Sequence, residues 1–383
     1  MGGSSGIRRS RFLVTYWENG AHQAYNYLTR ESSPCPALAV AILDAAEYWT
    51  SREAVCQTLT RWDADDVHGT IDDLIERRLL EAADRPPLPA ESALREWAKW
   101  NPVAGFFHGA TKAIGSVDPE GSQQRAARLL VDHEFPATLK QYPDRPRLEL
   151  PACSGGGPFP DLLRARRTWR EFGERDLSLG EVTTLLGLTF GVQRWLEVGD
   201  DRWVALKTSP SGGARHSIEA YLLAFHIEGL ENGTYHYCPD SHTLTLLQSP
   251  TPPELLVDFL PTQVDFHNPP ALVVMTSVFA RVQWKYQHPY AYRVVLLDAG
   301  HLGQTFALVA TALGLAPFCT AALDAPRLEQ HLGIDGISEA VIFAVGVGSR
   351  PRDKKWAPTH DHLPSPRTAP PAWAARLAAP PFP

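Results

Sequence analysis

Apolar and polar residues alternate near the amino terminus of the chain and then change to a helical spacing. Apolar residues occupy every second position from Phe12 to Tyr16, and Asn19-Gly20 supplies a type I′ turn, so a β-hairpin is predicted over residues 12–28. Three amphipathic helices are predicted to follow, over residues 36–49, 51–59 and 65–78. Because three short helices with a two-stranded ribbon are typical of a winged-helix domain, we place such a domain at residues 11–85.

The rest of the chain mixes helical and strand patterns between segments rich in proline. A linker with a helical segment is predicted at residues 86–160, the largest domain at 161–360 and a Pro/Ala-rich tail at 361–383. Ser178 and Glu181 form a capping box in front of a helix. Strands are predicted at 220–227, 234–237, 243–247, 271–279 and 341–346, and a long buried helix at 292–315. Since these elements show no regular βαβ repetition, an α+β fold is favoured.

Composition and charge limit the classes of partner. The 383 residues carry a formal net charge of −7, so general attraction to nucleic acid or to an anionic membrane is not expected. The third predicted helix is rich in carboxylates that would repel phosphates, which leaves a peptide-binding or a purely structural role for the winged unit. The longest apolar run, 306–318, is too short to cross a bilayer and is a core-helix candidate, so no membrane partner is expected.

Cysteine spacing and missing motifs exclude several other classes. The five cysteines are scattered without a C-x-x-C pair, which indicates reduced thiols, a cytoplasmic location and no metal site. The G-x-G-x-x-G, Walker, H-E-x-x-H and G-x-S-x-G motifs are absent from the sequence. A Rossmann dehydrogenase, a P-loop enzyme, a zincin or an α/β-hydrolase would therefore lack its fingerprint here.

A lysine and a tyrosine are neighbours in the aromatic segment 283–293, just before the long predicted helix. Such a pair can transfer protons when one member is desolvated, and Trp284 and Tyr290 are expected to give the lysine apolar surroundings that favour its neutral amine. Lys285 and Tyr286 are therefore candidate catalytic residues. The alternative is structural, with Lys285 capping a strand and Tyr286 packed in the core.

Two further segments suit a cofactor that carries a phosphate. Arg166, Thr168 and Arg170 stand at alternating positions, and guanidinium groups with a hydroxyl are good phosphate donors; the alternative is a solvated basic stretch. The turn at Ser209–Gly213 contains two glycines that would let backbone amides approach a flat ring, and the alternative is an ordinary tight turn. Arg350 adds one more arginine at the end of the last predicted strand.

Taken in order along the chain, these segments resemble the FMN-dependent nitroreductase superfamily. They resemble more closely its SagB-type branch, the azoline dehydrogenases of ribosomal peptide natural-product clusters. The R-x-S-x-R motif matches with Thr168 in place of serine, and Lys285-Tyr286 falls where the branch carries its catalytic pair. The other matching segments are Trp97–Pro102 with His108, Pro210–Gly213, Glu219–Tyr221, Leu230–Tyr237, Tyr292-Arg293, Asp298–Gln304 and Gly314-Leu315. The chain departs from the pattern at Trp195–Trp203, which looks like an insert, and at Thr320–Asp324, which lacks the glycine often found near the flavin.

The resemblance implies a nitroreductase-like α+β fold with one FMN per chain at the interface of a homodimer. FMN would take a hydride from a thiazoline or oxazoline of a modified precursor peptide, while Lys285 or Tyr286 takes the proton and an azole is left. Oxygen would reoxidise the flavin, and a cyclodehydratase complex is a further expected partner. The cofactor-binding residues implied are Arg166, Thr168, Arg170, Pro210, Ser211, Gly212, Gly213, Gln304 and Arg350.

Two other functions remain open for the same scaffold. One is an NAD(P)H-dependent nitro or quinone reductase, and the other is a flavin-binding scaffold subunit of a peptide cyclodehydratase complex. The Lys–Tyr pair and the winged unit favour azoline oxidation, because simple nitroreductases are shorter and lack both. The winged unit is predicted to bind the leader of the precursor, which could add a strand beside the hairpin; the alternative is a packing domain without a ligand.

Overall fold

A computed structural model of the chain describes residues 6–112, 128, 139–140, 142–150, 157–199, 202–266 and 268–352. Contacts between residues divide it into two compact units. Unit 1 comprises Met1–Ala113, Val278–Leu296 and Gly333–Ala340, and unit 2 comprises Ile114–Ser277, Leu297–Leu332 and Val341–Pro383. The predicted tail at 361–383 lies outside the described residues, and the predicted domain boundaries remain predictions.

The amino-terminal hairpin is present and belongs to a three-stranded sheet in unit 1. Its strands are β2 (Leu13–Glu18), β3 (Ala21–Asn26) and β4 (Glu31–Pro34), in the order β2-β3-β4. Glu18 pairs with Ala21 across the turn, where Asn19 and Gly20 have φ angles of 50° and 78°. Positive φ at both central residues is what a type I′ turn requires, so this turn was predictable from the Asn-Gly dipeptide. The third strand was not predicted.

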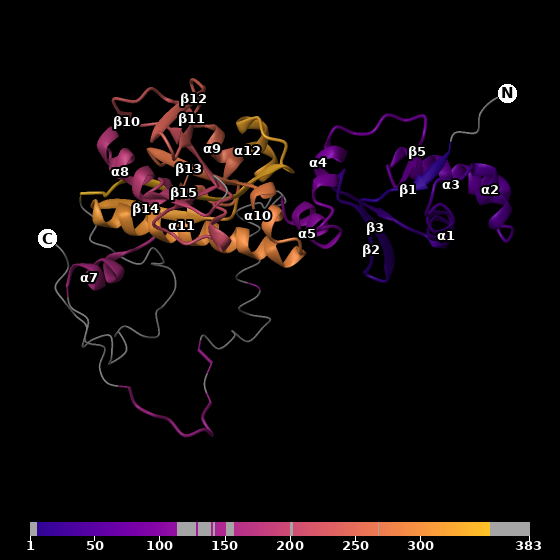
Figure 1. Ribbon diagram of the computed structural model, residues 1–383, viewed down its shortest axis with the longest axis horizontal. Coiled ribbons are helices and arrows are strands. Elements are labelled where there is room, and N and C mark those ends of the chain that lie inside the picture. Colours follow the sequence, from indigo (N-terminus) through magenta and orange to yellow (C-terminus); the bar gives the residue numbers. More distant parts are fainter. Residues whose placement is uncertain are drawn as a thin grey trace. The chain divides into compact units, whose positions relative to one another are not determined.

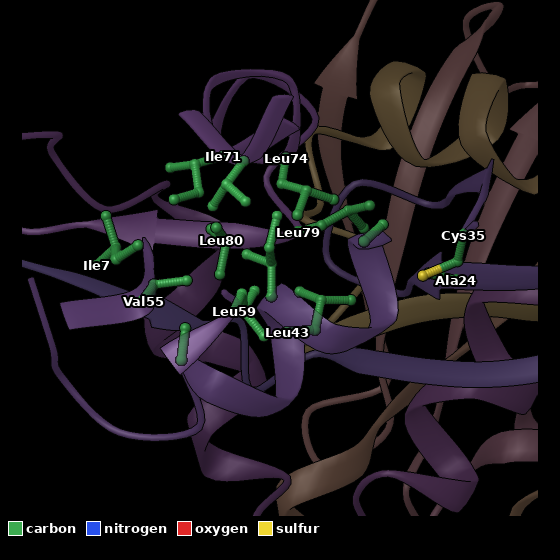
Figure 2. Packing of buried hydrophobic residues seen from close by; sticks show 14 residues of the cluster. Ile7, Ala24, Cys35, Leu43, Val55, Leu59, Ile71, Leu74, Leu79 and Leu80 are labelled. Carbon is green, nitrogen blue, oxygen red and sulfur yellow. The ribbon is translucent and has the colours of Figure 1, made fainter. Parts of the chain in front are cut away.

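Three helices follow the sheet at the predicted positions and form the first core of unit 1. They are α1 (Ala37–Ala45), α2 (Arg52–Thr58) and α3 (Ala64–Glu76), accompanied by the antiparallel pair β1 (Ile7–Arg9) and β5 (Leu80–Ala82). The Ser51 side chain caps α2 by accepting a hydrogen bond from the Ala54 amide, as its type predicts. Figure 2 shows Ile71 and Leu74 of α3 pointing toward Leu79 and Leu80 in this core. The assignment as a winged-helix domain remains a prediction.

A second, aromatic core in unit 1 joins segments that are far apart in the sequence. Its elements are α4 (Ala90–Glu96), α5 (Val103–Thr111), α10 (Phe279–Lys285), the short 3-10 turn Pro289–Ala291 and the first turn of α11 (Tyr292–Ala312). Trp97, Trp100, His108, Phe279 and Tyr292 form a network of edge-on, tilted and stacked ring pairs whose centres are 4.7 to 6.3 Å apart. All five side chains are buried, so this cluster packs the start of α10 and of α11 against α5 and the segment between α4 and α5.

Unit 2 is built on a six-stranded sheet with the order β12-β11-β9-β13-β15-β14 (Figure 1). The strands are β9 (Ile218–Ala224), β11 (Gly233–Cys238), β12 (Thr243–Gln248), β13 (Ala271–Val278), β14 (Leu315–Thr320) and β15 (Glu339–Ser349). Adjacent strands from β12 to β13 pair antiparallel, and so do β15 and β14. β9 and β13 are buried along almost their whole length, which explains their continuous apolar sequences.

Helices complete unit 2 and confirm its mixed character. They are α7 (Pro158–Ala165), α8 (Leu179–Phe190), α9 (Leu255–Phe259), α12 (Ala325–Leu332) and most of α11. The predicted capping box is present, with Ser178 and Glu181 exchanging hydrogen bonds at the start of α8. Helix α11 packs closely on the sheet, because a Cβ atom on Gly303 would lie 2.7 Å from the Phe343 ring of β15. The α+β prediction is confirmed.

Two predicted features of unit 2 were wrong or incomplete. The apolar run 306–318 is not one helix: α11 ends at Ala312, Gly314 adopts a φ of 73°, and β14 begins at Leu315. The described residues of the insert-like stretch 195–203 belong to the antiparallel strands β7 (Arg194–Glu197) and β8 (Trp203–Leu206) and to the segment between them. The shortest elements are β6 (Leu177–Ser178) and β10 (Ile227–Glu228), which pair parallel.

One described helical segment, Pro289–Ala312, is long and apolar enough to cross a bilayer by length and composition alone. A buried core helix passes the same test, and this segment contains α11, which contacts the sheet of unit 2 through Gly303. Length and hydropathy therefore do not identify a membrane span here.

Candidate functional site

The arginine segment after α7 runs along one end of the sheet in unit 2. The Trp169 amide donates a hydrogen bond of 2.9 Å to the Pro317 carbonyl of β14, and the Gly173 amide donates one of 2.8 Å to Ser349 of β15. Gly348 makes this approach feasible, since a Cβ there would lie 2.7 Å from the Phe172 ring. The backbone pairing places the alternating side chains of residues 166–170 next to β14.

Two of the predicted phosphate donors on this segment have different surroundings. The Thr168 side chain is exposed, whereas Arg170 is half-buried, lies 3.7 Å from the Asp265 carboxylate and stacks over Phe266 at 5.6 Å. Phe266 in turn stacks face to face on Phe318 of β14, with ring centres 4.0 Å apart. Asp265 and Phe266 therefore position the Arg170 side chain, the first by an ion pair and the second by its ring.

Arg166 lies near the thiol of Cys319, a residue of β14. Burial raises the pKa of Cys319 to about 11, and the positive charge of Arg166 opposes that increase. The Cys319 Sγ donates to the Gly303 carbonyl of α11 at 3.6 Å. Through these contacts the arginine segment is connected to the middle of α11, where Gln304 is exposed.

Arg350 already has partners in the protein. Its Nε donates to the Leu315 carbonyl at 3.0 Å and its Nη2 to the Thr311 carbonyl at 3.3 Å, while the guanidinium lies 5.6 Å from the Trp169 ring. Burial lowers the pKa of Arg350. The side chain thus caps the last turn of α11, and a structural role accounts for these two hydrogen bonds.

The predicted glycine turn is bound to α11 by hydrogen bonds. Ser211 Oγ and the Gly212 amide donate to the Asp298 carboxylate at 2.5 and 3.2 Å, and Ser209 Oγ lies 2.6 Å from Thr305 Oγ1. These partners recur at helical spacing on one face of α11, together with His301, which contacts the Pro210 carbonyl at 3.3 Å. One helix face therefore positions the whole turn.

Asp298 and Gly213 show how this turn keeps its shape. Asp298 is 3% exposed, and burial raises the pKa of its carboxyl group even though Ser211, Gly212 and His301 favour the ionised form. Gly213 has a φ of 61° and a ψ of 24°, a left-handed conformation that glycine adopts without strain. Asp298 was quoted in the sequence only as part of the helix signature, and its carboxylate was not predicted as the partner of this turn.

The catalytic candidates lie in unit 1, at the end of α10. Lys285 is the last residue of the helix and is exposed, with its Nζ 5.6 Å from the centre of the Tyr286 ring. Trp284 and Tyr290 are each 63% exposed. The prediction that these two rings give Lys285 apolar surroundings is therefore wrong within unit 1, because the lysine and both rings are exposed to solvent.

Buried residues of the aromatic cluster position this pair. The Trp100 Nε1 donates to the Tyr286 carbonyl at 2.8 Å, and the Trp97 Nε1 donates to the Ile337 carbonyl at 3.1 Å. His108 lies 2.9 Å from both the Tyr292 hydroxyl and the Gly336 carbonyl, and burial lowers the pKa of His108 to about 3. A neutral ring follows, with Nε2–H donating to the carbonyl and Nδ1 accepting from the hydroxyl.

The described residues offer neither a cluster of metal ligands nor a disulfide bond. Among them there is no group of three or more His, Cys, Asp or Glu residues arranged to hold a metal ion. The four described cysteines, Cys35, Cys56, Cys238 and Cys319, are free.

Comparison with known proteins assigns a family to this arrangement. The sequence profile of the Nitroreductase family matches residues 163–349. The nitroreductase-family protein MJ1384 of Methanocaldococcus jannaschii is 30% identical over 175 residues, which are 45% of this chain and 83% of that protein. The chain belongs to the nitroreductase family. Its fold is nitroreductase-like as predicted, and it is a flavin oxidoreductase of a family whose members bind FMN.

Other similarities extend over different shares of the chain. Trifolitoxin-processing protein TfxB of Rhizobium leguminosarum bv. trifolii is 25% identical over 305 residues, which are 75% of this chain and 81% of that protein. A nitroreductase structure from Anabaena variabilis is 28% identical with a TM-score of 0.43, and the match covers 50% of this chain but 38% of that one. A chain of the E. coli microcin synthetase McbBCD complex with truncated pro-MccB17 bound is 21% identical, with a TM-score of 0.40, and covers 61% of this chain and 94% of that one.

Proposed function

We propose that this protein is an FMN-dependent, SagB-type dehydrogenase that oxidises thiazoline or oxazoline rings to azoles in a ribosomally made peptide. The observation that carries the proposal is the extent of the similarity to the trifolitoxin-processing protein TfxB. The Nitroreductase profile covers residues 163–349, about half of the chain, whereas the TfxB alignment takes in 75% of it. The similarity to a peptide-processing protein therefore includes residues beyond the flavin-binding family domain.

The side chains of unit 2 fit a phosphate-bearing flavin by their chemistry. Arg166 and Arg170 supply positive charge beside β14, and Thr168 offers an exposed hydroxyl between them. We propose that these three residues bind the phosphate of FMN. Arg350 would contribute through Nη1, because its Nε and Nη2 already donate to backbone carbonyls.

The turn from Pro210 to Gly213, together with Gln304, would line the ring of the flavin. Gly212 and Gly213 carry no side chain, so their backbone can approach a flat ring. The hydrogen bonds that Ser211 and Gly212 donate to Asp298 fix the turn before any ligand arrives, which reduces the ordering cost of binding. Gln304 is exposed one residue from Thr305, whose hydroxyl contacts Ser209 of the same turn.

Aromatisation removes a hydride and a proton from adjacent positions of the azoline ring, and a new ring double bond forms. When bound, FMN supplies the two-electron acceptor for the hydride and is regenerated by oxygen. We propose that Lys285 or Tyr286 accepts the proton. Trp100 fixes the backbone of this pair through the Tyr286 carbonyl, and the exposed Lys285 amine is accessible to a substrate.

The partners proposed are a modified precursor peptide, a cyclodehydratase complex and a second copy of the chain. TfxB is named for the processing of trifolitoxin, which supports the proposal that this chain also acts on the precursor of a natural product. The homodimer is proposed on the resemblance to the superfamily, in which two chains build each flavin site. A cytoplasmic location is proposed because such a peptide is modified where it is made.

The test is conversion of a synthetic thiazoline peptide by the FMN-loaded protein in air. We expect the product to lose two hydrogen atoms by mass spectrometry and to gain azole absorbance. Lys285→Ala and Tyr286→Phe should each retain FMN and the fold, and the variant that lacks the base should lose roughly a hundred- to ten-thousand-fold in rate.

Matched variants keep this test specific. Lys99→Ala and Tyr290→Phe remove an exposed amine and an exposed hydroxyl from the same unit, and both should turn over the peptide as wild type does. Wild-type turnover by either FMN-loaded Lys285 or Tyr286 variant would remove that residue from the mechanism. Rapid NAD(P)H-dependent reduction of a quinone or nitroarene, without azole formation, would instead assign the reductase function.

A further inference from the structure

Unit 1 contains a cavity of about 470 Å³ on one side of its three-stranded sheet. Leu13 and Thr15 of β2, His22 of β3 and Val40 and Leu43 of α1 are among its lining residues. Leu13, Val40 and Leu43 contribute apolar side chains to its lining, and Arg9, Arg11 and Asp44 contribute charged ones. A cavity of this size is within the range of small-ligand pockets, so it has room for one or two side chains of a bound peptide.

Strand β2 presents an unpaired backbone edge beside this cavity. The Cys35 amide donates to the His22 carbonyl at 2.8 Å, so the backbone of His22 points toward β4 and does not bond to Trp17, its partner in β2. Hydrogen-bonded and non-bonded pairs alternate in an antiparallel ladder. The backbone N–H and C=O groups of Leu13, Thr15 and Trp17 therefore point away from β3, and β3 is the neighbour of β2 in this sheet as described.

The sequence of the opposite edge agrees with this register. On β4, Pro34 pairs with Gln23 and Ser32 with Tyr25, positions that alternate with the bonded pair of Ala24 and Ser33. A proline lacks an N–H group, so it is tolerated where the backbone points outward. That edge contains a proline, whereas β2 has none and keeps every outward N–H group available.

Arginines and carboxylates both surround the cavity. Arg9, Arg11 and Asp44 are its charged lining residues, and Arg9 forms ion pairs with Asp44 at 3.4 Å and with Glu47 at 3.7 Å, which leaves Arg11 as the arginine of this cavity for a ligand. A second cavity, of about 270 Å³, shares Ser10 with the first one and is also rich in arginine. Its charged lining residues are Arg8, Arg78, Arg85, Arg95, Glu81 and Glu91. Arginines outnumber carboxylates at both cavities, which favours an anionic ligand.

We propose that an acidic, extended segment of the precursor peptide binds as an additional strand along β2, with alternate side chains in the cavity and a carboxylate beside Arg11. The outward backbone groups of Leu13, Thr15 and Trp17 would provide the hydrogen bonds, and Arg11 would select the charge. This inference rests on the proposed function, because it assigns a docking site to that same peptide substrate. Duplex DNA fits less well, since Asp65, Asp66, Asp72 and Asp73 make α3 in the same unit acidic.

Binding can be measured by fluorescence anisotropy on the full, FMN-loaded chain. The probe is a fluorescein-labelled peptide of alternating glutamate and valine, about six residues long to match a typical strand. A peptide with lysine in place of glutamate tests the charge, and a labelled DNA duplex tests the alternative. We expect saturable, salt-sensitive binding of the glutamate peptide alone. Failure of the glutamate peptide to bind, equal binding of the lysine peptide, or preferential binding of DNA would overturn the proposal.

Two variants locate the site, each with a matched control. Thr15→Pro removes an outward N–H group from the β2 edge and should weaken peptide binding about tenfold, whereas Ser32→Pro makes the same change on the β4 edge and should not. Arg11→Glu reverses a charge at the cavity and should weaken peptide binding at least tenfold. Arg61→Glu reverses the charge of another exposed arginine and should leave peptide binding unchanged. Circular dichroism confirms that each variant is folded. Equal effects of a variant and its control would assign the peptide to another surface.

Turnover separates this inference from the proposed function. A short thiazoline peptide without an acidic segment should be oxidised equally by wild type and by Thr15→Pro or Arg11→Glu. The same ring attached to the glutamate–valine segment should show a KM raised about tenfold in both variants, with kcat unchanged. If neither peptide is oxidised, the proposed function fails while the anisotropy result still decides the docking site.

Discussion

His108 predicts a specific dependence of stability on pH. Its ring is buried between Trp97, Phe279 and Tyr292, and burial lowers its pKa from 6.5 to about 3, with the positive charge of Lys112 acting in the same direction. A histidine whose folded pKa is depressed adds stability that is fully present above its unfolded pKa. That stability is lost as the pH falls from 6.5 toward 3, because the unfolded chain binds the proton and the folded chain does not.

The size of the effect follows from the shift. Each pH unit within this window costs about 1.4 kcal/mol, so lowering the pH from 7 to 5 should cost wild type about 2 kcal/mol through His108 alone. In His108→Gln the amide can still donate toward the Gly336 carbonyl, but it cannot titrate. The variant should be less stable at pH 7, by about 1–3 kcal/mol for imperfect bonding of the buried Tyr292 hydroxyl. The advantage of wild type over the variant in free energy of unfolding should then be about 2 kcal/mol smaller at pH 5 than at pH 7.

Urea unfolding at both pH values, followed by tryptophan fluorescence, measures this difference, since Trp97 and Trp100 lie in the same cluster. The contributions of other titrating groups to the pH dependence of stability cancel in this comparison, because both proteins contain the same groups. His288→Gln, an exposed histidine in the same unit, should show no narrowing. Nitrogen chemical shifts of His108 should report a neutral Nε2–H ring at pH 5. An equal loss of stability in wild type and His108→Gln, or a protonated ring at pH 5, would refute the reasoning.

Three further predictions concern unit 2 and the assembly. Replacing both Arg166 and Arg170 by alanine should yield largely apo protein, seen as lost flavin absorbance after gel filtration, and a full flavin spectrum would exclude them as the phosphate site. Asp298→Ala should remove two hydrogen bonds from the 209–213 turn, at about 1.5–3 kcal/mol each for bonds to a charged group, and weaken FMN retention at least tenfold. Burial raises the pKa of Asp298, so the stability that this group contributes is present at low pH and is lost as the pH rises through the folded pKa. The free energy of unfolding of Asp298→Asn should therefore increase relative to that of wild type as the pH rises. Light scattering should show an FMN-bound dimer, and a stable FMN-bound monomer would contradict the shared site.

Local sequence signals predicted the elements that local chemistry decides. The Asn19-Gly20 turn and the Ser178–Glu181 capping box are present because their backbone requirements are met by neighbouring residues alone. The buried strand β13 was predictable from its unbroken apolar run. The boundary between α11 and β14 was not, because hydrophobicity is continuous from Phe306 to Phe318 and periodicity alone cannot separate a buried helix from a buried strand.

Long-range contacts at the candidate site could not be predicted in the same way. Asp298 accepts hydrogen bonds from residues 86 and 87 positions away, and Trp100 donates to a carbonyl 186 positions away. No local pattern marks such partners, although Asp298 is the single acidic residue of α11, a signal that could have drawn attention to it. The exposure of Trp284 and Tyr290 was likewise missed, because aromatic composition does not show which way a side chain projects.

The family and the substrate are supported by different parts of the chain, and this separates their tests. The Nitroreductase profile matches residues 163–349, so replacing Arg166 should impair every flavin-dependent reaction of the protein, the oxidation of a short thiazoline peptide included. The β2 edge lies outside that range, so Thr15→Pro should impair the oxidation of a long acidic peptide and leave that of a short ring unchanged. A protein that loses both activities in Thr15→Pro would need its amino-terminal unit for stability rather than for recognition. If Thr15→Pro loses neither activity, the peptide substrate binds at another surface or the protein has no peptide substrate.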